Sequence, residues 1–271
     1  MAFIRITHND FELKYNAFKG DTYDMEEWEG DTRIDEEPWI QRYQHEAKIV
    51  SGVINKFECQ SVLEIGSGPG TLCKYVTEAA GGLVTSVTED GSEHHHQVAD
   101  TDFVYHMLDK KNAKKIHTKR NYPGEMFIND LNAGIDTRPL LDDGYDLIIC
   151  NDVLEHLANP TQIIQQLYHL NSGKGKMFVS IPNWRMAHQM TYRGLWDYDN
   201  FLYFMAIHGY IAISLHESPL VTPHYPKLDS EDLLPDNMLR SWNWYFILDK
   251  SFEFHKNELY IVPVKRGRDG K

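Results

Sequence analysis

The chain has 271 residues, of which 42% are hydrophobic and 12% aromatic, enough apolar material for one sizeable domain core. Its 40 acidic and 27 basic side chains give a formal charge of -13 at pH 7, which repels phosphate backbones and anionic lipid surfaces. This charge excludes a general nucleic-acid coat protein. The sequence contains no apolar run near the roughly 18 residues of a membrane span, so we expect no membrane insertion.

The cysteine content indicates a reducing environment. Cys59, Cys73 and Cys150 lie far apart and form no CxxC pattern. The first residues, Met-Ala-Phe-Ile-Arg, do not have the basic region and apolar run of a secretory signal. We therefore expect reduced thiols and a cytoplasmic protein.

Residues 1–37 are predicted to form an acidic N-terminal arm, followed by one folded domain at residues 38–271. Within this arm, residues 21–37 contain nine acids and one base. A solvated tail is the favoured interpretation, and a flap over the site that repels anionic substrates is the alternative. The next stretch, 38–57, is predicted to be an amphipathic helix, because apolar residues recur at spacings of three and four: Trp39, Ile40, Tyr43, Ala47, Val50, Val53 and Ile54.

Short apolar runs then alternate with helical patterns, which is typical of a parallel sheet with helices on both faces. In chain order we predict a strand at 61–65, a helix at 71–80, a strand at 83–88, a helix at 97–108, a basic connection at 110–120, strands at 126–128 and 146–150, a helix at 163–170 and a strand at 176–181.

The pattern changes after these units. The first of the later segments, at 184–204, is rich in aromatic residues. Two late strands are predicted at 210–215 and 258–264, with a loop-rich insertion at 219–249 between them.

A glycine-rich turn is the most informative local motif. It follows the apolar strand at 61–65 and reads Gly66-Ser67-Gly68-Pro69-Gly70, with Glu64 two residues before the first glycine. Glycines there permit a sharp turn and let a ligand approach the backbone closely. A dinucleotide-binding GxGxxG motif would need glycine at position 71, where this chain has threonine.

This GxGxG motif resembles the first motif of the class I S-adenosylmethionine-dependent methyltransferases. The resemblance implies that Gly66, Gly68 and Gly70 contact the methionine part of the cofactor S-adenosylmethionine, with Glu64 near its amino group. It also implies an acid at the end of the second predicted strand that binds the ribose hydroxyls. Glu89 is our candidate for that role.

Three later segments extend the resemblance over roughly residues 45–265. Asp130 and Leu131 correspond to the family's carboxylate for the adenine amino group and its apolar neighbour. Residues 145–160, with Asn151 expected beside the cofactor, resemble the fourth-strand segment, and residues 173–183 resemble the fifth. The implied fold is a Rossmann-like α/β three-layer sandwich with a seven-stranded, mostly parallel sheet and an antiparallel last strand.

Methyl transfer to a hydroxyl requires that the acceptor proton be removed, and His156 is the candidate general base, with Glu155 beside it. A purely structural role for His156 is the alternative. Asp152, Glu155 and His156 also have the spacing of a short helical turn, similar to the arrangement in metal-dependent small-RNA 2′-O-methyltransferases. A divalent metal at these three residues is therefore a second, less favoured hypothesis.

Within the family, the segment around His156 and residues 194–198 look most like ubiquinone-biosynthesis and sugar or natural-product O-methyltransferases. The predicted reaction is methylation of a hydroxyl on a small molecule or glycan. A nucleic-acid methyltransferase is the runner-up, disfavoured by the net charge. A non-catalytic scaffold that binds the cofactor is the alternative from a different class.

Overall fold

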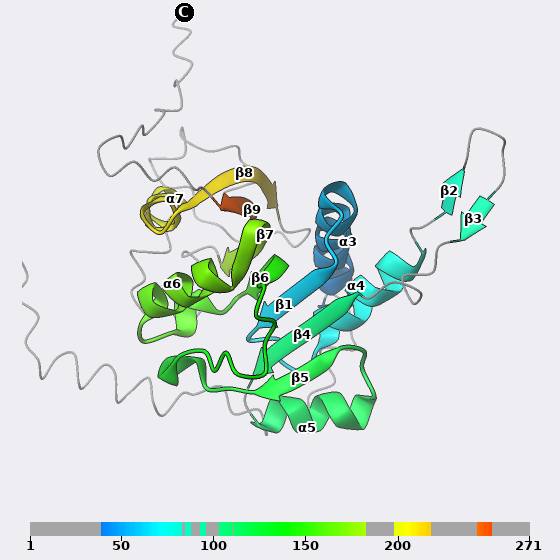
Figure 1. Cartoon of the computed structure of the whole chain (residues 1–271), viewed down its shortest axis with the longest axis horizontal. Helices are drawn as coiled ribbons and strands as arrows, with labels where there is room; N and C mark the ends of the chain where they lie inside the picture. The colour runs from blue at the N-terminus through cyan, green and yellow to red at the C-terminus, as the bar shows by residue number, and fades with distance from the viewer. Residues whose placement is uncertain are drawn as a thin grey trace, which may run out of the picture.

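A seven-stranded sheet forms the centre of the protein in a computed structural model that describes residues 39–82, 85–87, 93–95, 103–109, 111–182, 198–217 and 243–250. The strand order across the sheet is β5-β4-β1-β6-β7-β9-β8 (Figure 1). The strands are β1 Ser61–Ile65, β4 Val104–Asp109, β5 Glu125–Ile128, β6 Tyr145–Asn151, β7 Asn171–Pro182, β8 Tyr210–Glu217 and β9 Asn243–Lys250.

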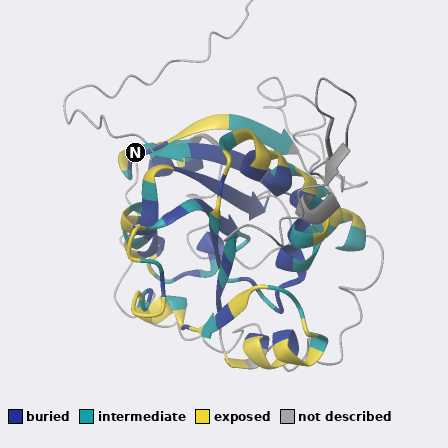
Figure 2. Ribbon diagram, turned by 45° about the vertical axis from the view of Figure 1, so that its right-hand side comes forward, coloured by how far each residue is buried: buried dark blue, intermediate teal, exposed yellow. Residues whose placement is uncertain are grey.

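Helices cover both faces of this sheet. On one face, α3 (Trp39–Phe57), α4 (Thr71–Gly82) and α5 (Lys111–Arg120) share a hydrophobic core with the sheet. On the other face, α6 (Pro160–Leu170) and α7 (Tyr198–Ile207) pack in a second core. Figure 2 shows buried strands between helices with exposed outer surfaces. The predicted three-layer α/β sandwich is confirmed.

Strand direction places the loops that carry the motifs at one edge. The strands β5, β4, β1, β6 and β7 run parallel to one another, so their carboxyl ends meet at the same side of the sheet, which we call the carboxyl edge. β9 runs antiparallel to both β7 and β8, which confirms the predicted antiparallel last strand. In open α/β sheets, ligands bind outside the carboxyl ends of the strands.

The second strand of the sheet differs from the prediction. β4 lies beside β1, whereas β2 (Thr85–Val87) pairs only with β3 (Glu93–His95) in a separate two-stranded sheet. The predicted helix at 97–108 was wrong over its second half, because Tyr105 and Met107 are buried on alternate positions of a strand. The basic stretch after it, predicted as a connection, is the helix α5.

The last strand also differs from the prediction. β9 covers the end of residues 219–249, which we predicted to be loop-rich, and extends to Lys250. The predicted strand at 258–264 is outside the described residues. The segment from Trp244 to Leu248 is buried at every position, as expected for a strand covered on both faces. Several prolines before it made the whole region look irregular.

Other predictions are confirmed or fall outside the described chain. The helices predicted at 38–57 and 163–170 match α3 and α6. The acidic arm lies outside the described residues, and the aromatic-rich segment is described only from residue 198, where α7 begins. The three cysteines are buried free thiols. None of the helices that the structure describes is long and apolar enough to cross a bilayer.

Candidate active site

The glycine turn at the end of β1 has left-handed backbone angles that only glycine adopts without strain. The φ angles are +61° at Gly66, +54° at Gly68 and +84° at Gly70. A Cβ atom at Gly66 would lie 2.4 Å from Cγ2 of Val153, so this glycine permits close packing within the protein. A Cβ atom at Gly68 would meet no atom of the described residues within 4 Å. The turn is therefore closed on one side and open at Gly68, where a ligand can approach the main chain.

Asp109, the last residue of β4, stands beside this open turn. Its Oδ2 atom accepts a hydrogen bond from the main-chain nitrogen of Gly68 at 2.6 Å. Asp109 thus holds the place next to β1 that we predicted for Glu89, which lies outside the described residues. The role of Glu89 stays a prediction. Sequence reasoning missed Asp109 because β2 and β3 lie between it and the turn in the sequence. Asp109 could have been predicted from the alternating residue pattern of β4, because this strand ends on that acid.

Glu64 is buried inside β1, directly before the turn. The side chain of Tyr105 donates a hydrogen bond from Oη to Glu64 Oε2 at 2.8 Å. Burial raises the pKa of Glu64 to about 8, although the hydrogen bond from Tyr105 opposes this shift. The carboxyl group is therefore mostly protonated at neutral pH. Its predicted role near the cofactor amino group stays a prediction.

Asp130 and Leu131 lie at the end of β5, next to the end of β4. Asp130 is exposed and its Oδ1 atom accepts a hydrogen bond from the main-chain nitrogen of Asn132 at 3.1 Å. Leu131 is partly buried against the core. The main-chain nitrogen of Asn129 donates to the carbonyl of Asp109 at 2.7 Å, which holds the two strand ends together. The structure thus brings Asp109 and the 130–131 pair to neighbouring positions of the carboxyl edge.

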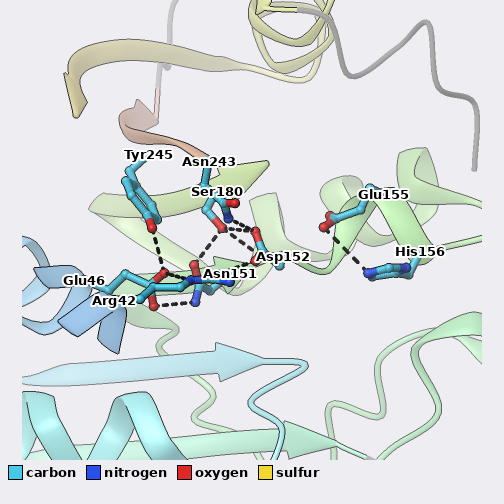
Figure 3. A network of polar contacts seen from close by, with 9 residues as sticks. All are labelled: Arg42, Glu46, Asn151, Asp152, Glu155, His156, Ser180, Asn243 and Tyr245. Carbon is cyan, nitrogen blue, oxygen red and sulfur yellow. Dashed lines mark hydrogen bonds and ion pairs between the residues drawn. The ribbon is translucent and has the colours of Figure 1, made fainter. Parts of the chain in front are cut away.

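A polar network lies at the ends of β6 and β7, under the N-terminal part of α3 (Figure 3). Arg42 forms ion pairs with Glu46, at 2.7 Å, and with Asp152. The side chain of Arg42 is 11% exposed and that of Glu46 is fully buried. We call the complete group the Arg42 network; its members are Arg42, Glu46, Asn151, Asp152, Ser180, Asn243 and Tyr245.

Asn151, predicted beside the cofactor, uses its side chain inside this network. Its Nδ2 atom donates to Glu46 Oε2 at 2.9 Å, and its Oδ1 atom lies 2.6 Å from the hydroxyl of Ser180. Sequence reasoning missed Arg42, Glu46, Ser180 and the β9 residues. The sequence did offer one indication of this network, because Arg42 and Glu46 form a charged pair at positions i and i+4 of α3.

The three candidates for base or metal ligand point in different directions. Asp152 faces the Arg42 network, while Glu155 and His156 lie apart from it in the short helix η4 (Leu154–His156) (Figure 3). The His156 side chain is 29% exposed, and its Nε2 atom lies 3.7 Å from Oε1 of the buried Glu155. Burial raises the pKa of Glu155 well above its usual value, with a further contribution from the charge of Asp152. Within the described parts of the chain, no three histidine, cysteine, aspartate or glutamate side chains gather as a metal ion requires.

Comparisons with known proteins were made for sequence and for structure. No curated protein matches the sequence. Similar solved structures include the methyltransferase in the complex with the Haloferax volcanii Trm112 methyltransferase activator, with a TM-score of 0.53 and 10% identity over 84% of this chain and 98% of that chain. Another is the magnesium protoporphyrin IX methyltransferase of Synechocystis PCC 6803 with bound S-adenosylmethionine, with a TM-score of 0.51 and 13% identity over 85% of this chain and 93% of that chain.

A structure from Nostoc punctiforme assigned as an O-methyltransferase has a TM-score of 0.49 and 13% identity, and the match covers 77% of this chain but 57% of that chain. The profile of a methyltransferase domain family matches residues 37–212, which is more than half of the sequence. The match includes the glycine turn, Asp109 and the ends of β5 and β6. The chain therefore belongs to this family and is a class I S-adenosylmethionine-dependent methyltransferase.

Proposed function

We propose that S-adenosylmethionine binds across the carboxyl edge, over the glycine turn and between Asp109 and Asp130. The observation that carries this proposal is the open turn at Gly68, where an added Cβ would meet no protein atom and where a carboxylate stands within hydrogen-bond distance. Main-chain groups of such a turn can approach a ligand closely. The family places the ribose on an acid at the end of the strand beside β1, which here is Asp109.

The bound cofactor supplies an electrophilic methyl group, and the chain has to align the acceptor and remove its proton. Asp109 is the acceptor for the ribose hydroxyls, and the exposed carboxylate of Asp130 is in position for the adenine amino group. His156 is the general base, because its partly exposed imidazole lies at the same edge and has a second carboxyl group, Glu155, at 3.7 Å. Glu155, whose burial favours the protonated carboxyl group, is close enough to orient the ring.

The proposed acceptor is a hydroxyl group of a small molecule or glycan. Removal of a hydroxyl proton needs a general base, and the partly exposed imidazole of His156 is the candidate at this edge. The net charge of -13 disfavours a polyanionic acceptor such as nucleic acid. This proposal is finer than the family assignment and rests on the chemistry of His156.

The first experiment is a calorimetric titration of the purified chain with S-adenosylmethionine and S-adenosylhomocysteine. We expect micromolar binding that is lost in Gly68→Arg, because the new side chain fills the open turn. Gly52→Arg is the matched control, since Gly52 lies on α3 and an added Cβ there also meets no atom within 4 Å. Equal binding by Gly68→Arg and the native chain would refute the proposed position of the cofactor.

A second experiment addresses the acceptor. Hydroxyl compounds are screened with tritiated S-adenosylmethionine, and His156→Ala is expected to lower the turnover rate about 10²-fold or more. Activity that persists in this variant would contradict the proposed base. Loss of activity after exhaustive chelation would instead support the metal hypothesis, and binding of the cofactor without turnover of any acceptor class would support the scaffold alternative.

A further inference from the structure

Helix α3 precedes β1 and contributes the only guanidinium group of the Arg42 network. Arg42 and Glu46 lie one turn apart on this helix, and both side chains are almost completely shielded from solvent. The ring of Trp39 lies 5.8 Å from the Arg42 guanidinium. Two carboxylates from distant parts of the sequence, Glu46 and Asp152, share this cation. Neither would be well accommodated here without it, because a buried charge without a partner is costly.

Asp152 makes more hydrogen bonds within the Arg42 network than any other of its members. Its φ angle is +53°, a left-handed conformation that is unfavourable for a residue with a Cβ. The main-chain nitrogen donates to the hydroxyl of Ser180 at 2.9 Å, and the carboxylate accepts hydrogen bonds from Arg42 and Asn243. The surrounding side chains therefore hold the backbone of Asp152 in a conformation that it would not adopt alone.

The residue after Asp152 packs against the glycine turn. Val153, the next residue, is 6% exposed, and its Cγ2 atom occupies the space into which a side chain at Gly66 would point. The main-chain carbonyl of Val153 also accepts a hydrogen bond from His156 at 3.0 Å, at the beginning of η4. A displacement of Asp152 would therefore move Val153, which lies against the glycine turn. It would also move the start of η4, the short helix that carries His156.

We propose that Arg42 is a positioning residue for the cofactor: through its ion pair with Asp152, it holds Val153 against Gly66 and so fixes the glycine turn in its binding conformation. This inference rests on the proposed position of S-adenosylmethionine over that turn. It assigns a functional role to a helix that lies outside the alternating strand and helix units of the domain. Arg42 itself does not contact the cofactor in this proposal, because its guanidinium group is committed to Glu46 and Asp152.

The test compares S-adenosylhomocysteine affinity with thermal stability in the full chain. Arg42→Met keeps the length and apolar stem of the side chain but leaves the two carboxylates without their cation. We expect its affinity for S-adenosylhomocysteine to fall about tenfold or more, since small displacements of a binding turn have large effects. Arg42→Lys should recover part of this loss, because a lysine retains the charge but not the paired hydrogen bonds of a guanidinium.

Lys176→Met is the matched control. Lys176 forms an ion pair with Asp249 at 2.9 Å and is 10% exposed, close to the 11% of Arg42, but it is at the opposite end of the sheet from the glycine turn. Both Met variants should melt at lower temperature. Only Arg42→Met should lose cofactor affinity, whereas the control should bind within about twofold of the native chain.

The possible outcomes separate this inference from the proposed function. If the native chain binds S-adenosylhomocysteine and Gly68→Arg does not, the cofactor position stands; native-like affinity in Arg42→Met would then overturn the role of Arg42 alone. Equal affinity losses in Arg42→Met and Lys176→Met would also overturn it, since both would reflect general destabilisation. If Arg42→Met does not fold, Val153→Ala carries the test, because it removes the contact with Gly66 and keeps the ion pair. Native-like affinity in a folded Val153→Ala would refute the proposal.

Discussion

The two halves of the carboxyl edge are built in different ways. In the cofactor half, at the ends of β1, β4 and β5, main-chain atoms of the glycine turn form the surface, and Asp109 contacts that turn directly. In the other half, at the ends of β6, β7 and β9, side chains from four separate elements form the Arg42 network. The first half depends on local backbone conformation, and the second on contacts between distant residues.

One buried carboxyl group from each half, Glu64 and Asp152, differ in the direction of their pKa shift. Glu64 in the cofactor half has a neutral donor, Tyr105, and burial raises its pKa to about 8. For Asp152 in the network, burial alone would raise the pKa, but the charge of Arg42 and hydrogen bonds from Ser180, Arg42 and Asn243 lower it. Glu64 therefore favours its protonated form at neutral pH, whereas Asp152 favours its ionised form. Four variants would break or sharpen this comparison.

Glu64→Gln is expected to have the largest effect, seen as a change in the pH dependence of stability. Between the usual glutamate pKa of 4.5 and about 8, the folded chain binds this proton more strongly than the unfolded chain. Stability must then fall as pH rises through this window. One unit of pKa difference corresponds to about 1.4 kcal/mol, so the whole window is worth on the order of 5 kcal/mol. Urea unfolding between pH 4 and 9 measures it.

The glutamine variant lacks this titration and should become more stable than the native chain as pH rises. Asp152→Asn is the contrasting control. The pKa of Asp152 is lowered by folding, so its contribution is present above the unfolded value and is lost as pH falls through the folded value. Parallel stability curves for the native chain and Glu64→Gln up to pH 8 would contradict a protonated Glu64.

Gly66→Ala should have the next largest effect, on stability itself. Alanine at this position combines a left-handed φ with a contact of 2.4 Å to Val153, for a cost of about 3 kcal/mol. Gly68→Ala has a similar φ but an open Cβ position, so we expect about 1 kcal/mol from the backbone alone. Chemical unfolding compares the two. Equal costs would mean that Val153 moves aside easily, which would also weaken the proposed role of Arg42.

Much of this architecture could be predicted from local sequence. The glycine turn, the helix α3 and the parallel strands β1, β6 and β7 are marked by contiguous residue patterns. Asp109 was missed because the acid was chosen by its spacing from the glycine turn, whereas the described strand that pairs with β1 on this side is β4. Residues such as Arg42 and Ser180 could not be grouped from sequence, since only the fold brings positions so far apart together.

Asp109→Asn tests the proposed ribose acid against Glu89, the acid predicted from the sequence. Loss of the carboxylate charge should weaken S-adenosylhomocysteine binding about tenfold to a hundredfold, because hydrogen bonds to an ion are stronger than those to a neutral amide. The amide oxygen of asparagine can still accept from Gly68, so the turn should persist. Glu89→Gln is the control and should bind normally. A larger effect in Glu89→Gln than in Asp109→Asn would restore the assignment made from sequence.

Ser180→Ala should have the smallest effect, because it removes one member of the Arg42 network and leaves the ion pairs in place. The Ser180 hydroxyl accepts from the main-chain nitrogen of Asp152 at 2.9 Å and lies 2.6 Å from the side-chain oxygens of Asn151 and Asp152. Its loss leaves a shielded N–H group without its acceptor, which costs about 1–2 kcal/mol.

The control for this last variant is Ser172→Ala, on the same strand, whose hydroxyl makes a longer hydrogen bond of 3.4 Å to Asp146. We expect less than about 0.5 kcal/mol from it, as for an ordinary partly exposed position. Urea unfolding at pH 7 gives both values. If the two serines cost the same, the left-handed Asp152 does not need Ser180, and Arg42 with Asn243 would be sufficient to hold it. A larger cost at Ser180, together with weaker cofactor binding, would extend the positioning role from one ion pair to the side chains that support it.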